Sequence, residues 1–207
     1  MNIRSGYQHG FAAGEENLNL ALASELLRHD PVFHRIPLSE VPGIVNGAIR
    51  HGAETAGRTL RRFGAREPIR IANLMDVRII FDITSSQSRP LNVLSRYSEN
   101  PPTIVIYESA LRNCREKVAT WEIRSRVLLS ELTNICVSHE LYHHLERASM
   151  NFIDLTYRVP VLNLGFIRIE KSVRTLSEIS AHSFARTLLN LPILPCCLDP
   201  RIFAAAG

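Results

Sequence analysis

The chain has 207 residues, of which 45% are hydrophobic and 21% are charged. This composition is typical of a globular protein with a sizeable core, and it excludes a disordered or fibrous chain. The formal net charge is +4, and Lys and Arg are spread along the sequence. We therefore expect a solvated basic surface and no direct binding of nucleic acid; DNA binding through this surface is the weaker alternative.

The first residues, M-N-I-R-S-G-Y-Q-H-G, lack the apolar stretch of a signal peptide, and no apolar run is long enough to cross a membrane. We expect no membrane partner and a cytoplasmic location. The cysteines match neither a zinc ribbon nor a redox C-x-x-C pair, so we expect all of them to be reduced, with Cys114 and Cys136 buried. The cysteines are Cys114, Cys136, Cys196 and Cys197.

The N-terminal part of the chain is expected to be helical. Residues 1–16 are predicted to form a loose terminus, and leucines at helical spacing predict a short amphipathic helix over 17–29. Apolar residues at near-helical spacing predict a second helix over 44–63, which Gly64 closes.

A sheet is expected in the middle of the chain. Pro68 begins a short helix over 69–75, at the position where proline is tolerated. Three segments rich in β-branched and aromatic residues then predict short strands over 77–83, 91–97 and 103–107. Because the strands follow one another closely, we expect a small, mostly antiparallel sheet.

The C-terminal half is predicted to be mainly helical. A helix over 109–118 precedes one long helix over 120–149, whose apolar residues recur at helical steps. Residues 151–170 are apolar but irregular, and a last helix over 176–191 ends at prolines.

These elements predict an α+β protein, mostly helical, with the small three-stranded sheet packed on the long helix. We divide the chain into an N-terminal helical extension, residues 1–44, and a main domain, residues 45–207.

The long helix carries the sequence V-S-H-E-L-Y-H-H-L-E at residues 137–146. Residues four apart lie on one face of a helix, so His139 and His143 can present two imidazoles to one cation. Imidazole is a favoured zinc ligand, and the H-E-x-x-H spacing is the one used in zinc-dependent peptide hydrolysis. Glu140 lies about 100° round the helix from His139, where it can act on a water as a base.

A catalytic zinc site needs a third protein ligand. Glu178 is our first candidate, and Glu170 is a second in less regular sequence. His182 lies one turn after Glu178 and could orient a ligand or stabilise an oxyanion. The competing interpretation is a solvated helix face that carries three histidines. His144 points about 100° away from His143, and we expect it at the surface without a functional role.

The residues HELYHHLE, followed by E-x-x-A-x-x-F-A-x-x-L-L-x-x-P, resemble the ImmA/IrrE family of zinc metallopeptidases. The second pattern starts at Glu178 and ends at Pro192. Two positions depart from the family pattern: His182 replaces a frequent Asn, and Tyr142 replaces a frequent small residue. The likeness covers roughly residues 45–195.

This resemblance implies a zincin-like α+β fold in which His139, His143 and Glu178 bind zinc and Glu140 is the catalytic base. It further implies a protein substrate, since members of the family cleave DNA-binding repressors of the helix-turn-helix type. Three tyrosines could each donate to an oxyanion, and the sequence does not choose among them. These tyrosines are Tyr97, Tyr107 and Tyr142.

We therefore expect a zinc-dependent endopeptidase. The alternative is a zinc-containing interaction or sensor protein that hydrolyses nothing, although an intact Glu140 argues against it because a structural site needs no base. The same ligands would also hold manganese or cobalt.

Overall fold

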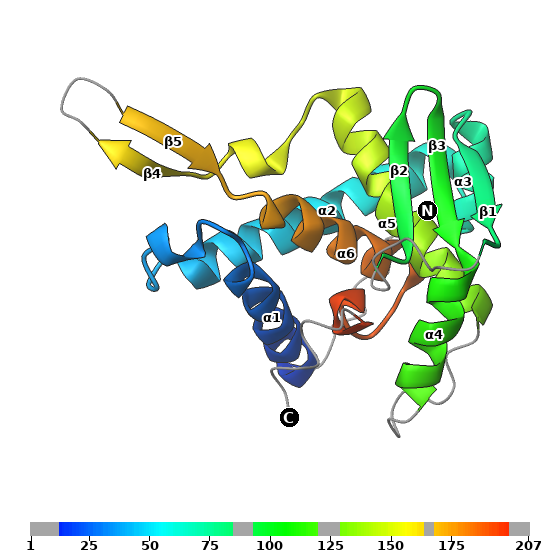
Figure 1. Ribbon diagram of the computed structural model, residues 1–207, viewed down its shortest axis with the longest axis horizontal. Helices are drawn as coiled ribbons and strands as arrows, with labels where there is room; N and C mark the ends of the chain where they lie inside the picture. The colour runs from blue at the N-terminus through cyan, green and yellow to red at the C-terminus, as the bar shows by residue number, and fades with distance from the viewer. Residues whose placement is uncertain (1–12, 85–92, 120–128, 164–167, 199–207) are drawn as a thin grey trace, which may run out of the picture.

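The computed structural model describes residues 13–84, 93–119, 129–163 and 168–198 of the chain (Figure 1). The described part is α+β and mostly helical, as predicted. Its helices are α1 (Ala13–Arg28), α2 (Val41–Phe63), α3 (Pro68–Leu74), α4 (Glu108–Ala119), α5 (Leu129–Ser149) and α6 (Thr175–Leu189). Its strands are β1 (Arg78–Asp82), β2 (Ser95–Glu99), β3 (Pro102–Tyr107), β4 (Arg158–Asn163) and β5 (Arg168–Ser172). Short 3-10 helices are η1 (Phe33–Arg35), η2 (Ile153–Leu155) and η3 (Pro195–Leu198).

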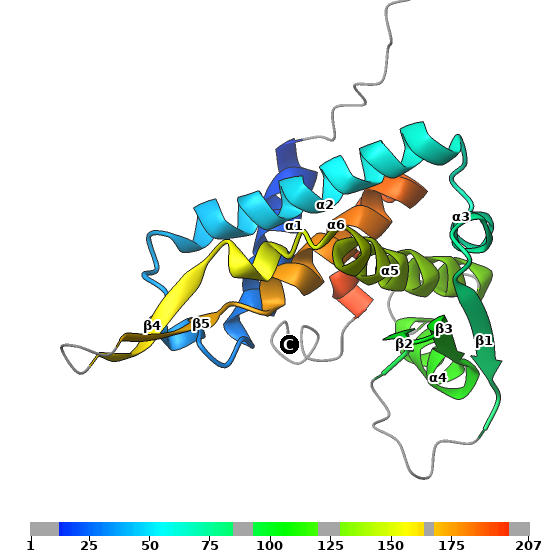
Figure 2. The same cartoon turned by 90° about the horizontal axis from the view of Figure 1, so that it is seen from above.

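Helices α2 and α6 cross at very close range, and Figure 2 shows α6 between α2 and α5. A Cβ atom added at Gly52 would lie 2.1 Å from the backbone oxygen of Ser180. The hydroxyls of Ser180 and Ser183 each donate to a backbone oxygen of α2, those of Ala48 and Ile49, at 2.8 and 2.6 Å. Small residues on both helices thus bring the two backbones into contact and fix the position of α6, which carries Glu178.

Helix α1 is tied to the rest of the fold by two buried polar side chains. Asp30, just after α1, accepts hydrogen bonds from the backbone N–H groups of Val32 and Thr175, both at 2.9 Å. It therefore caps the N-terminus of α6 in trans. Asn19 accepts a hydrogen bond from the backbone N–H of Leu194 at 2.7 Å. The boundary that we drew after residue 44 lies inside α2, because that helix begins at Val41, earlier than the predicted 44.

The three-stranded sheet has the order β1-β3-β2. Strand β2 pairs antiparallel with β3, whereas β1 pairs parallel with it. The sheet is therefore mixed, and the expectation of a mostly antiparallel sheet is wrong. Strands β2 and β3 form a hairpin, and β1 enters on the far side of β3, so that β1 and β2 are both edge strands. Strand β2 begins later and ends later than the predicted 91–97, of which residues 91 and 92 lie outside the described residues.

A second, two-stranded sheet was not predicted. Residues 151–170 were expected to be irregular, but β4 and β5 pair antiparallel across this region, with a register shift between Pro160 and Leu162. The hairpin extends away from the body of the protein (Figure 1). Proline in the strand weakened the sequence signal, and the irregular register accommodates it.

Helix α1 begins at Ala13, inside the stretch 1–16 that was expected to be a loose terminus, so that part of the prediction is wrong. The remaining helices agree with the predicted pattern. Gly64 ends α2 in the left-handed conformation, at φ 61°, and α3 and α4 lie where they were expected. The described part of the long helix, α5, packs against the sheet and against α6. The start of the predicted helix, residues 120–128, lies outside the described residues. Phe184 and Leu188 are fully buried in the core.

All four cysteines are free thiols, as expected. Cys136 is buried, but Cys114 is only partly buried, so the prediction that both are buried holds for Cys136 alone. Within the described residues, none of the helices has the length and apolar character that a membrane crossing requires.

Candidate metal centre

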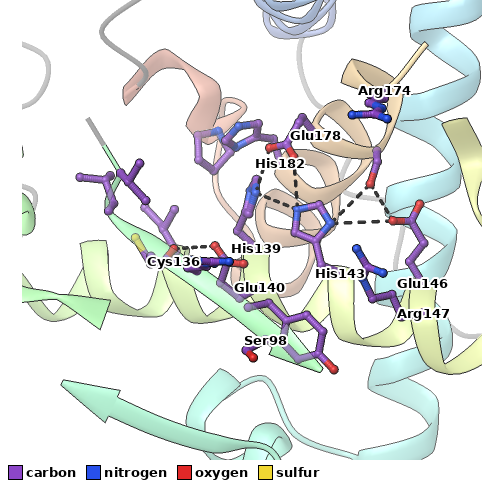
Figure 3. Close-up of a pocket in the computed structure, with 18 of the residues that line it drawn as sticks. Ser98, Cys136, His139, Glu140, His143, Glu146, Arg147, Arg174, Glu178 and His182 are labelled. Atoms are coloured by element: carbon purple, nitrogen blue, oxygen red, sulfur yellow. Dashed lines mark hydrogen bonds and ion pairs between the residues drawn. The ribbon is translucent and has the colours of Figure 1, made fainter. Parts of the chain in front are cut away.

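His139, His143 and Glu178 come together between α5 and α6 (Figure 3). The Nε2 atoms of the two histidines lie 3.2 Å apart. The carboxylate of Glu178 faces both rings, with Oε2 3.2 Å from Nε2 of His139 and Oε1 3.5 Å from Nε2 of His143. One ligand atom of each residue lies within 4.8 Å of the others. Two imidazole nitrogens and a carboxylate oxygen form a suitable donor set for a divalent transition metal such as zinc.

The three side chains are electrostatically coupled. Burial opposes ionisation of the Glu178 carboxyl, but the hydrogen bond from His139 and the charges of the histidines outweigh it and hold its pKa well below the usual range. Burial likewise disfavours the charged form of His139, but the Glu178 carboxylate raises the His139 pKa above its ordinary value. A carboxylate that holds a proton on an adjacent imidazole provides the negative charge that a metal cation would satisfy once it displaced that proton.

Glu140 lies beside this cluster on the next face of α5. It is buried at 6% exposure, and its Oε1 accepts a 2.7 Å hydrogen bond from the hydroxyl of Ser95 on β2. Glu140 lines the same cavity as the candidate ligands but is not a member of the ligand cluster. This position agrees with the helical offset expected from the sequence.

A buried carboxylate, Glu146, supports the other ring nitrogen of His143. Glu146 Oε2 lies 3.8 Å from His143 Nδ1 and accepts a 2.7 Å hydrogen bond from the hydroxyl of Ser177. That hydroxyl also lies 3.4 Å from Nδ1. Oε1 of Glu146 accepts from the hydroxyl of Tyr142 and from the backbone N–H of Ile153, both at 3.3 Å.

Burial works against ionisation of Glu146, but the nearby His143 and the hydrogen bonds from Ser177 and Ile153 outweigh it and lower the Glu146 pKa. Partners of this kind fix the orientation and tautomer of a metal-binding histidine. Sequence reasoning missed Glu146. The available signal was its i+3 spacing from His143 on the same helix.

The other candidate residues are distributed around the centre. The His182 ring lies 4.6 Å from the His139 ring, centroid to centroid, and lines the cavity. His144 is partly buried, with Nδ1 2.9 Å from the Tyr97 hydroxyl, so the expectation that it lies at the surface is wrong. Because His144 lies about 100° from His143 on the helix, it faces the sheet and not the solvent. Glu170 lies on β5 and is not a member of the ligand cluster.

Among the three candidate tyrosines, Tyr97 lines the cavity. Tyr142 is fully buried, and its hydroxyl donates to Glu146, the carboxylate next to His143. Tyr107 lies at the end of β3 and is not among the residues that line the cavity.

The centre opens into a cavity of about 970 Å³ between β2, α5 and α6. This volume is at the upper end of the range of small-molecule sites, and it is sufficient to hold several residues of an extended peptide.

In comparisons with known proteins, no family model, no curated protein and no solved structure matches this chain. The fold and the site therefore define the protein by their own geometry: an α+β protein with a candidate metal centre between α5 and α6.

Proposed function

We propose that this protein is a zinc-dependent endopeptidase of the ImmA/IrrE type, with a zincin-like fold. The observation that carries the proposal is the convergence of His139, His143 and Glu178 beside a hydrogen-bonded Glu140 on one open cavity. A purely structural metal site is closed by protein ligands and has no need of a base.

Within this proposal His139, His143 and Glu178 hold the metal, which supplies Lewis acidity to a water and to a peptide carbonyl when it is bound. Glu140 accepts the proton of the attacking water and later passes it to the leaving amine. Ser95 holds one oxygen of that carboxylate and so orients it. His182 and Tyr97, which both line the cavity, are the candidates to donate to the developing oxyanion.

The proposed substrate is a protein, and the sequence resemblance favours a helix-turn-helix repressor in the cytoplasm. Strand β2 is an edge strand along the cavity, which supports binding of an extended peptide by strand addition. The proposed substrate is recognised as protein, without contact to nucleic acid.

The test combines metal content with cleavage in three proteins: wild type, Glu178→Ala and Glu140→Gln. We expect elemental analysis to find about one zinc ion per chain in wild type and Glu140→Gln, and much less in Glu178→Ala. We expect cleavage of a denatured-protein peptide mixture by wild type alone.

Three outcomes would contradict the proposal in different ways. A folded wild type that binds no zinc when zinc is supplied would exclude the metal centre. Zinc binding without cleavage of any peptide or candidate repressor would favour the non-catalytic sensor. Cleavage by Glu140→Gln at the wild-type rate would show that Glu140 is not the catalytic base.

A further inference from the structure

The two ends of the cavity are chemically different, and the alignment of β2 with α5 defines them. Three side-chain pairs join the strand to the helix in order: Ser95 to Glu140, Tyr97 to His144 and Glu99 to Arg147. The strand and helix therefore run in the same direction, with His139 at the start of this contact and His143 within it.

The end of the cavity near the start of β2 is apolar. Val93 and Leu94, which precede β2, line it together with Ile135 of α5 and Leu198 of η3. Figure 3 shows Cys136 on this side of the histidines. These four side chains are apolar, so an apolar side chain of a ligand can be buried among them. The exposed Arg96 of β2 also lines the cavity, next to Ser95.

The other end carries charge. Arg147 and Arg174 line it, and Figure 3 shows both on the side of Glu146. Arg147 is paired with Glu99. Two further carboxylates line this end: Glu146 accepts from Ser177 and Asp154 accepts from Ser172 at 3.1 Å, and neither is paired with an arginine in the described residues.

Arg174 differs from these residues. In the part of the chain that the structure describes, its guanidinium makes no ion pair or hydrogen bond, and the residue is exposed. This end of the cavity therefore offers a cation with its hydrogen-bond donors available to a ligand.

The pairing of β2 sets the direction of a bound strand. The backbone N–H of Tyr107 donates to the oxygen of Leu94 at 3.0 Å, so residues 94, 96 and 98 direct their backbone groups toward β3. The backbone groups of residues 95, 97 and 99 then point to the open edge. Antiparallel pairing is the more stable mode, so an added peptide runs from the Glu99 end toward the Ser95 end.

We propose that the cavity selects peptides with an acidic residue on the N-terminal side of the scissile bond and an apolar residue on its C-terminal side, and that Arg174 is the specificity-determining residue for the acidic position. This inference rests on the proposed peptidase function. It assigns the acidic side chain to the Arg174 end and the apolar side chain to the pocket of Val93, Leu94, Ile135 and Leu198.

The test measures binding and cleavage separately. Zinc-loaded, full-length Glu140→Gln protein is titrated into fluorescent peptides that share one sequence and differ only in an Asp, Ala or Lys on the N-terminal side of a Leu. A set with this residue moved along the peptide covers the possible registers. We expect the best Asp peptide to bind about tenfold more tightly than its Lys counterpart, since a hydrogen-bonded charge pair forms with one and repulsion with the other.

The matched variants are made in the same background. Arg174→Gln should remove the preference, and Arg174→Glu should reverse it in favour of Lys. Arg50→Glu, which changes the net charge equally on the exposed face of α2, should leave the preference intact. Equal affinity for the three peptides, or an unchanged preference in Arg174→Glu, would overturn the inference.

Hydrolysis of the same peptides by wild type distinguishes the two proposals. Cleavage without any charge preference in binding would overturn the specificity inference and support the peptidase. The expected preference in binding with no cleavage of any peptide would support the assignment of Arg174 and overturn the peptidase.

Discussion

Ser95 on β2 donates a 2.7 Å hydrogen bond to Oε1 of Glu140 on α5, and this bond links the edge of the sheet to the proposed catalytic base. Both side chains line the cavity, and Glu140 is nearly excluded from solvent. The strand therefore does two things in the proposed mechanism: it presents an open edge to a peptide, and it orients the carboxylate that acts on the water.

Removing this hydroxyl tests the orienting role. We expect Ser95→Ala to lower kcat by about tenfold, because a misplaced base loses part of the gain from positioned proton transfer. Zinc content should not change, since Ser95 contacts none of the candidate ligands. The control is Ser98→Ala, an exposed serine of the same strand that also lines the cavity. Equal rates for the two variants would show that Ser95 does not position Glu140.

The support of His143 predicts an effect on metal affinity. We expect Glu146→Gln to weaken zinc binding by about 10- to 100-fold, because the residue holds Nδ1 of His143 through Ser177. Ser177→Ala should weaken zinc binding in the same direction and by less, because Glu146 keeps its bonds to Tyr142 and Ile153.

Competition with a chromophoric chelator measures the zinc affinity of each variant. The control is Glu99→Gln. Glu99 is a carboxylate at the same end of the cavity, but it is paired with Arg147 and not with His143. Unchanged zinc affinity in folded Glu146→Gln would show that this carboxylate does not support metal binding by His143.

Close packing of α2 on α6 predicts an unusual response to glycine substitution. Alanine in place of a mid-helix glycine ordinarily stabilises by about 0.5–1 kcal/mol, and we expect this for Gly47→Ala, where an added Cβ meets nothing within 4 Å. Gly52→Ala should instead lower the free energy of unfolding by about 1–3 kcal/mol, because its Cβ would overlap the backbone oxygen of Ser180. Urea titration measures both. Stabilisation by Gly52→Ala would contradict the helix crossing.

The sequence was sufficient where the structure is local. Residues four apart on a helix must share a face, so His139 and His143 could be paired before any tertiary contact was known. Glu140 could likewise be placed about 100° round the helix from His139, outside the face that the two histidines share. Glu178 required a match to a two-helix pattern, because nothing local connects α6 to α5. The position of α6 depends on its contact with α2 through Gly52 and Ser180, which are far apart in sequence.

The features that sequence reasoning missed are produced by tertiary contacts. The parallel pairing of β1 with β3 depends on which side of the hairpin the first strand enters, and residue types do not encode it. Ser95 and Ser177 have partners on other elements, so neither could be distinguished from an ordinary polar residue. Strand β4 was not predicted because Pro160 is unfavourable in a strand; the structure accommodates it at a break in the register.

The thiol of Cys136 provides a last prediction about the ligand set. Cys136 lines the cavity one turn before Glu140, where a thiolate would be a competing zinc ligand. Burial, with a smaller contribution from the nearby Glu140 carboxylate, raises the pKa of Cys136 to about 12. The thiolate fraction is therefore negligible at neutral pH and stays small at pH 9, so the thiol should be inert in the folded protein.

Thiol labelling with a chromogenic disulfide at pH 8 tests this expectation. In the native protein we expect Cys136, Cys196 and Cys197 to stay unlabelled, since all three are buried. In denaturant all four thiols should react, and Cys136→Ser should reduce that number to three without changing native labelling or zinc content. Rapid labelling of native Cys136, identified by mass spectrometry, would mean that the site holds a reactive thiolate. If Cys136→Ser then also lowered the zinc content, the ligand set would have to include sulfur beside the two imidazoles and the carboxylate.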